Sequence, residues 1–141
     1  MKSTDYYDAH AATLYSQYSA MDPALVHISW AEAHLPSSPG LACDLGAGSG
    51  RDANWLAAMG WDVVAVEPSG PMRDRAKASS HARIEWLDDV LPDLKSLCAR
   101  GLHFDLVLLG AVWMHLLPGT RERAFRVLSE LLKPKGVLVI T

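Results

Sequence analysis

The chain has 141 residues, of which 50% are hydrophobic and 21% are charged, and its formal net charge is −3. This length and composition are typical of one globular domain with a single hydrophobic core. The negative charge argues against the basic surface that tight nucleic-acid binding requires, so we expect no nucleic acid to be bound by this segment. We also expect a cytoplasmic protein without a membrane span, because no apolar run is long enough to serve as a span or a secretory signal and the only cysteines, Cys43 and Cys98, form no disulfide framework.

The N-terminal part of the chain is predicted to be helical. Its apolar and aromatic residues recur at helical spacing and form one stripe, made of Tyr7, Ala11, Leu14 and Tyr18. Asp22 followed by Pro23 predicts the start of a second helix, because an N-cap acceptor precedes a proline at the first helical position. The apolar face predicted for this second helix consists of Leu25, Ile28 and Ala31.

After Gly40, short apolar runs alternate with amphipathic stretches of helical length. The runs predicted to be strands are 41–45, 63–66, 83–87, 104–109 and 137–140. The stretches predicted to be helices lie near 51–59, 70–79, 92–100 and 119–132, and the last is expected to stop at residues 133–136, where two lysines stand with a proline and a glycine. Because parallel strands need a crossover between them, this alternation predicts an α/β fold with a mainly parallel sheet and helices on both faces.

The first predicted strand leads into a loop with three glycines, Gly46, Gly48 and Gly50, and a helix follows directly. Glycine permits a sharp turn and lets a ligand approach the backbone closely, so we expect a nucleotide-like ligand at the carboxyl end of this strand. The dinucleotide fingerprint G-x-G-x-x-G/A is not met, because Arg51 stands where a count from Gly46 requires glycine or alanine.

Two acidic residues narrow the class of ligand. Asp44 precedes the glycines, where a carboxylate would repel a pyrophosphate and favour a cationic group such as an amino-acid ammonium. Glu67 ends the second predicted strand, where a carboxylate can accept hydrogen bonds from both hydroxyls of a ribose. Together they predict an adenosine ligand that has no phosphates and carries a charged amino-acid tail, and S-adenosylmethionine is such a ligand.

The chain resembles the class I S-adenosylmethionine-dependent methyltransferases. Five segments follow the motif order of that family: 41–51, 63–67, 87–92, 104–117 and 131–140. The resemblance implies a Rossmann-like doubly wound sheet with strand order 3-2-1-4-5. Since the family's sheet normally has two further strands, we expect residues 41–141 to be a cofactor-binding core truncated after strand 5, with residues 1–40 as a helical lid or cap.

The resemblance also implies which residues bind the cofactor. It places the methionine portion beside Asp44, Gly46, Gly110 and Ala111, with Ala47 and Gly50 completing the glycine loop. It places the ribose and sulfonium near Gly48 and Glu67, and the adenine beside Pro68, Ser69 and either Asp88 or Asp89. One of these two aspartates can instead cap the helix expected near residue 92. Tyr7 or Tyr15 would reach the cofactor if the N-terminal stripe forms a lid, and the alternative for that stripe is core packing.

The activity implied is methyl transfer by direct displacement to a small-molecule acceptor, for which the protein supplies position and electrostatics. His115, just after the fourth strand, is the candidate base if the acceptor must lose a proton, and a packing role is its alternative. No metal site is expected, because no two histidines stand three or four residues apart. The alternative function is a non-catalytic module that binds S-adenosylmethionine or S-adenosylhomocysteine, or that serves in assembly. We further expect a homodimer through the exposed edge of strand 5.

Overall fold

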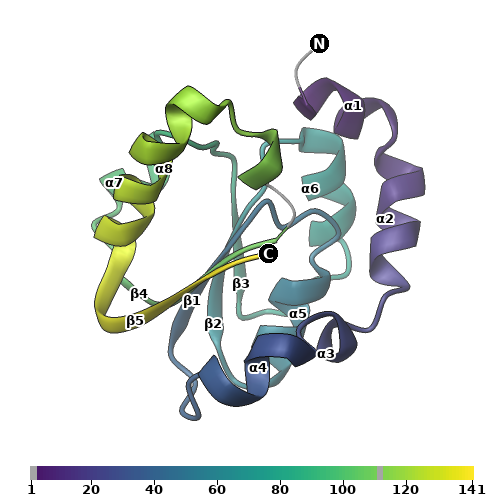
Figure 1. Ribbon diagram of the computed structural model, residues 1–141. Coiled ribbons are helices and arrows are strands. Elements are labelled where there is room, and N and C mark those ends of the chain that lie inside the picture. The colour runs from purple at the N-terminus through teal and green to yellow at the C-terminus, as the bar shows by residue number, and fades with distance from the viewer. Residues whose placement is uncertain (1–2, 111–112) are drawn as a thin grey trace.

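The computed structural model describes residues 3–110 and 113–141 of the chain (Figure 1). The helices are α1 (Ser3–Ala9), α2 (Ala11–Ser19), α3 (Pro23–Val26), α4 (Ile28–His34), α5 (Arg51–Ala58), α6 (Gly70–Lys77), α7 (Lys95–Ala99) and α8 (Pro118–Leu131), with a 3₁₀ turn, η1, at Trp113–His115. The strands are β1 (Leu41–Leu45), β2 (Asp62–Val66), β3 (Ile84–Leu87), β4 (Phe104–Leu109) and β5 (Leu132–Ile140). Within these residues, no helix has both the length and the apolar character needed to cross a membrane.

The five strands form one parallel sheet in the order β3-β2-β1-β4-β5, which confirms the predicted fold. The direction of winding reverses at β1, which pairs with β2 on one side and with β4 on the other. In open α/β sheets, ligands bind at such a switch point, outside the carboxyl ends of the strands.

Helices cover both faces of the sheet, with α7 and α8 on one side and α5 and the N-terminal helices on the other (Figure 1). In β4, Leu106 and Leu108 pack toward α5, whereas Val107 and Leu109 pack toward α7 and α8. This double burial explains why the central strands are apolar at successive positions rather than at alternate ones.

The predicted stripe of the N-terminal segment packs on α6. Ala11 and Leu14 are buried against Met72, and the rings of Tyr7 and Tyr18 pack at the edges of the same cluster. This cluster lies on one side of the glycine loop, so the N-terminal helices are positioned to reach the carboxyl end of the sheet (Figure 1).

The second N-terminal helix differs from its prediction. Its start is confirmed, because the Asp22 carboxylate accepts a hydrogen bond from the backbone N–H of Ala24 at 3.0 Å. The helix then breaks at His27 into α3 and α4. Two of the three residues of the predicted apolar face are wrong, since Leu25 and Ile28 are 66% and 69% exposed, whereas Ala31 packs against the core. The break changes the helical phase, and the side chains buried in their place are those of His27 and Trp30.

The last helix ends close to the predicted stop at residues 133–136, but these residues already belong to a strand. Helix α8 ends at Leu131 and β5 begins at the next residue, so these four residues form an irregular part of the strand. The pairing shifts there from Phe104 with Leu132 to Leu106 with Val137. Gly136 is required at this point, because a Cβ atom would lie 2.9 Å from the carbonyl oxygen of Phe104. The chain therefore passes from α8 into the sheet without a separate loop.

Candidate functional site

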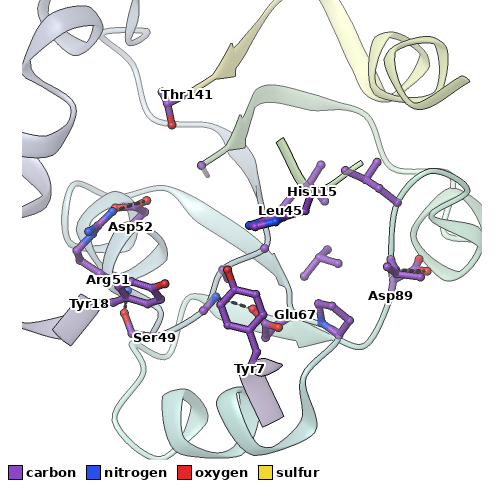
Figure 2. Close-up of a pocket in the computed structure, with 18 of the residues that line it drawn as sticks. Tyr7, Tyr18, Leu45, Ser49, Arg51, Asp52, Glu67, Asp89, His115 and Thr141 are labelled. Carbon is purple, nitrogen blue, oxygen red and sulfur yellow. Dashed lines mark hydrogen bonds and ion pairs between the residues drawn. The ribbon is translucent and has the colours of Figure 1, made fainter. Parts of the chain in front are cut away.

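A cavity of about 430 Å³ opens at the carboxyl ends of β1, β2 and β4 (Figure 2). Its floor is formed by residues that end these strands, and its walls by the glycine loop, the segment after β3, η1 and the N-terminal helices. The cavity therefore lies at the switch point of the sheet, where the sequence predicted a ligand.

The glycine loop is held between β1 and β2 by backbone hydrogen bonds. The N–H groups of Gly46 and Ala47 both donate to the carbonyl oxygen of Val66, at 2.8 and 3.0 Å. Gly48 has a positive φ of 56°, a conformation that glycine adopts without strain. The ring of Tyr18 lies 3.7 Å from the position of a Cβ on Gly48. A side chain on this residue would thus be strained by the backbone conformation, and its Cβ would be in van der Waals contact with the tyrosine.

Glu67 is the buried acid at the centre of the cavity wall, and its side chain is oriented by the backbone. Its Oε1 accepts from the N–H of Gly48 at 2.8 Å, and its Oε2 accepts from the N–H of Ser69 at 2.9 Å. Burial raises the pKa of Glu67 above its ordinary value, and the hydrogen bonds from these two N–H groups offset only part of this rise. A carboxylate has about four lone-pair positions, so each oxygen keeps one for a ligand hydroxyl.

Asp89 stands at one end of the cavity, beside the apolar side chains of Val90, Leu91 and Leu94. Its Oδ2 also accepts from the backbone N–H of Leu97 at 2.8 Å, so it anchors α7 as well. Asp88 points elsewhere, because its side chain is 67% exposed and lies 3.6 Å from Arg73. The structure therefore brings Asp89 to the cavity and leaves Asp88 outside.

The opposite end of the cavity is formed by Arg51, Asp52 and His27. Asp52 is only 8% exposed, and its Oδ2 lies 3.7 Å from the position of a Cβ on Gly110. His27 Nε2 lies 3.0 Å from Asp52 Oδ1. The sequence assigned no ligand-binding role to these three side chains, since nothing in it indicates that a residue at a helix break meets the helix after the glycine loop.

Asp44 does not line the cavity. It is buried beneath the glycine loop at 2% exposure, and its Oδ2 has no hydrogen-bond partner among the described residues. Burial, together with the nearby Asp52, raises the pKa of Asp44 well above its ordinary value. Burial also acts to raise the pKa of Asp52, but contacts with His27 and Arg51 hold it below the ordinary value. The negative charge on the cavity wall at this end is therefore that of Asp52.

Other residues predicted for the site divide into two groups. Those that line the cavity are Gly46, Ala47, Gly48, Glu67, Pro68 and Gly110. Those placed elsewhere are Ser69, which is buried as the N-cap of α6, Gly50, which packs against Trp86, and Tyr15, which hydrogen-bonds Ser79 at 2.7 Å. Ala111 lies outside the described residues.

Aromatic side chains form the wall nearest the N-terminus. Tyr7, Tyr18 and His115 all line the cavity, and the rings of Tyr7 and His115 meet edge to face with centroids 6.3 Å apart. Burial and the neighbouring Tyr18 raise the pKa of Tyr7 to about 12, so its phenol keeps its proton at neutral pH. Tyr18 was not among the predicted site residues, although it shares the stripe of Tyr7.

A family model described as a methyltransferase domain matches residues 43–140. The chain belongs to this methyltransferase-domain family. Together with the strand order, the match shows a class I S-adenosylmethionine-dependent methyltransferase domain, whose cofactor is S-adenosylmethionine. No curated protein matches the chain.

Solved structures share the fold of this methyltransferase domain. The complex of DhpI with SAM and HEP superposes with a TM-score of 0.72 at 20% identity, over 95% of this chain and 61% of that protein. An S-adenosylmethionine-dependent methyltransferase from Mesorhizobium loti has a TM-score of 0.68 at 26% identity, over 81% and 52%. The glycopeptide N-methyltransferase MtfA, solved with S-adenosylmethionine, has a TM-score of 0.65 at 20% identity, over 84% and 54%. The domain thus spans 52–61% of the length of these proteins.

The cavity has the chemical features that S-adenosylmethionine requires. Glu67 offers one open acceptor position on each carboxylate oxygen, which suits the two hydroxyls of a ribose. The apolar side chains beside Asp89 suit the faces of an adenine, and Asp89 itself suits its polar edge. At the opposite end of the cavity, the ion pair of Arg51 and Asp52 supplies one positive and one negative charge. The residues present therefore fit this cofactor.

Proposed function

We propose that this domain is an enzyme that binds S-adenosylmethionine in the cavity and transfers its methyl group by direct displacement to a small-molecule acceptor. The observation that carries the proposal is the carboxylate of Glu67, which two backbone N–H groups hold at the switch point of a sheet matched by the methyltransferase model. When bound, the cofactor would supply a methyl group on a sulfonium sulfur, which leaves as a neutral thioether, so the transfer needs no nucleophile from the protein.

In this proposal the chain's own residues bind the cofactor and orient it. Glu67 holds the ribose, Asp89 lies at the adenine, and Gly46 and Gly48 let the cofactor lie close to the backbone. Tyr7 and Tyr18 close one wall of the cavity and exclude water from the reacting groups. Fixing donor and acceptor in line supplies much of the acceleration in such a reaction.

His115 is the base in this proposal when the acceptor must lose a proton. It lines the cavity from η1, which follows β4, and its ring packs on Tyr7. An acceptor that reacts without losing a proton needs no base, and in that case His115 serves only as part of the aromatic wall. The acceptor is proposed to be a small molecule, because the cavity has a volume of about 430 Å³ and the chain has a net charge of −3, which offers no basic surface for nucleic acid.

Calorimetry with S-adenosylmethionine, S-adenosylhomocysteine and NAD tests the binding part of the proposal. We expect binding of the first two and none of NAD, because an acid at the ligand's charged end disfavours a pyrophosphate. Absence of binding at millimolar S-adenosylmethionine, or tighter binding of NAD, would contradict the proposal. Cofactor binding without turnover on a panel of amine, hydroxyl and thiol acceptors would favour the alternative of a non-catalytic binding or assembly module.

We also propose that the chain dimerises through β5. Among the described residues, β5 pairs only with β4, so its other edge presents unpaired backbone N–H and C=O groups. Light scattering at increasing protein concentration is expected to show a mass of twice 15.4 kDa. The N–H of Thr141 donates to Leu109 of β4, so the N–H of the preceding residue, Ile140, faces the free edge. Ile140→Pro removes this outward N–H group and is expected to weaken the dimer, whereas a wild-type monomer at the highest concentration would refute it.

The remaining proposals concern location and organisation. The free thiols of Cys43 and Cys98 suit a reducing compartment, and we propose the cytoplasm. We also propose that residues 1–40 act as a cap on the core of residues 41–141. The support for this division is that α1 and α2 contact α6, and that their tyrosines form part of the cavity wall.

A further inference from the structure

Arg51 and Asp52 form an ion pair in the wall of the cavity. The guanidinium donates from Nε to Asp52 Oδ1 at 2.9 Å and from Nη2 to Oδ2 at 3.2 Å. Figure 2 shows this pair at the end of the cavity opposite Asp89, with Glu67 between the two ends. A ligand whose sugar is held by Glu67 and whose base points toward Asp89 therefore directs its remaining part at the ion pair.

A buried chain of contacts fixes this pair from the N-terminal side. The indole N–H of Trp30 donates to Nδ1 of His27 at 3.0 Å, so Nε2 carries the hydrogen of the neutral imidazole. Nε2 lies 3.0 Å from Asp52 Oδ1, and the imidazole stacks on Trp55 with ring centroids 5.1 Å apart. One nitrogen of His27 accepts from Trp30, the other lies beside Asp52, and the residue is 1% exposed, so His27 is placed to act on Asp52 rather than on a ligand.

We propose that Arg51 and Asp52 recognise the α-amino-acid zwitterion of the cofactor's tail, and that His27 positions Asp52 for this task. The inference rests on the proposed function of the cavity. A guanidinium beside a carboxylate offers a cation for the ligand's carboxylate and an anion for its ammonium. Arg51 has five N–H donors, of which the ion pair uses two, so donors remain for a second carboxylate.

Two further observations favour a zwitterion over a ligand of single charge. The ion pair has no net charge, so an ion of either sign alone would meet one attractive and one repulsive partner. Asp44 lies beneath the loop and away from the cavity wall, so Asp52 is the carboxylate that can contact an ammonium at this end. Since His27 lies at the junction of α3 and α4, binding of the tail is also linked to the docking of these helices.

The test compares two ligands that differ only in the tail. S-adenosylhomocysteine carries the amino acid, whereas 5′-methylthioadenosine has the same thioether nucleoside without it. By calorimetry, Asp52→Asn is expected to weaken binding of S-adenosylhomocysteine by about 10- to 100-fold, the range for loss of a hydrogen bond to a charged group. Binding of 5′-methylthioadenosine is expected to change by less than about 3-fold, since that ligand does not reach the ion pair.

A matched pair of variants isolates the role of His27. His27→Gln keeps an N–H donor that can reach Asp52, and it is expected to retain the preference for S-adenosylhomocysteine. His27→Asn keeps an acceptor for Trp30 but is too short to reach Asp52, and it is expected to lose about 10-fold of that preference. A merely structural role for His27 would weaken binding of both nucleosides equally.

The outcomes separate this inference from the function on which it rests. Equal weakening of both ligands by Asp52→Asn, or no weakening of either, overturns the recognition role. Failure of the wild-type protein to bind either nucleoside overturns the proposed function itself. If Asp52→Asn does not fold, as judged by circular dichroism, the same comparison with Arg51→Met decides, because methionine retains the stem of the side chain and removes only the cation.

Discussion

Replacing Glu67 with alanine is expected to lower the affinity for S-adenosylhomocysteine by at least about 100-fold. The variant loses two hydrogen bonds from ribose hydroxyls to a charged acceptor, each worth about 1.5–3 kcal/mol. Isothermal titration calorimetry measures the change, and circular dichroism establishes that the variant is folded. An affinity within threefold of wild type, roughly 0.7 kcal/mol, would remove the basis for placing the ribose at Glu67.

Glu85→Ala is the matched control for this variant. Glu85 lies on the neighbouring strand β3 and pairs with Arg100 on the surface, with a side chain that is 57% exposed. Its replacement removes the same charge and the same number of atoms away from the cavity. We expect the affinity to stay within about twofold of wild type, because surface substitutions of this kind change little.

The affinity should also depend on pH through Glu67. Burial raises the pKa of its carboxyl above the ordinary value of 4.5, and the protonated form has fewer acceptor positions for the ribose. Affinity is therefore expected to fall as the pH is lowered through this raised pKa, at a higher pH than for an exposed glutamate. Because the pKa of Glu67 is raised in the folded state, protonation of this group favours folding. Acid unfolding driven by Glu67 therefore does not account for the loss of affinity. Glu67→Gln should remove this pH dependence.

Replacing Met72 with alanine is expected to lower the free energy of unfolding by about 2–5 kcal/mol, because the change leaves a cavity at a fully buried position. Met72 packs against Ala11 and Leu14, and its Cε lies 3.8 Å from the position of a Cβ on Gly48. The variant removes support from both the N-terminal helices and the glycine loop, so its affinity for S-adenosylhomocysteine should fall as well. Urea unfolding measures the first effect and calorimetry the second.

Two methionine variants serve as controls. Met72→Leu nearly conserves the buried volume and should cost less than about 1.5 kcal/mol. Met114→Ala makes the same chemical change at a site that is 65% exposed, and its effect should stay within about 0.5 kcal/mol. An unfolding midpoint for Met72→Ala equal to that of wild type would show that the N-terminal helices do not depend on this contact.

The strands and the glycine loop could be predicted because their signals are local. Each strand that is buried on both faces must be apolar over its own few residues, as Phe104–Leu109 shows, and this requirement does not depend on the partner. Glu67 could be predicted for the same reason, since a polar residue at the end of such a strand must lie at the carboxyl edge of a parallel sheet. The stripe of Tyr7 and Tyr18 follows from helical spacing alone.

The sequence could not show which of two nearby side chains reaches the cavity, because this depends on the direction in which each side chain leaves the backbone. Asp88 and Asp89 are adjacent after β3, and their side chains diverge toward Arg73 and toward α7. Tyr15 and Tyr18 both lie on α2, where they are about 60° apart around the helix at 3.6 residues per turn. Tyr15 accordingly turns outward to Ser79, and Tyr18 lies over the glycine loop.

By itself, the sequence determined the sheet, its order by family resemblance, and the positions of the glycine loop and Glu67. Only the tertiary structure showed that His27 meets Asp52, and that Asp52 rather than Asp44 carries charge on the cavity wall. The physical reason is that hydrophobic periodicity records what each segment must bury on its own. Contacts between buried polar groups depend instead on how distant segments pack, and the break at His27 that produces this contact leaves no periodic signal.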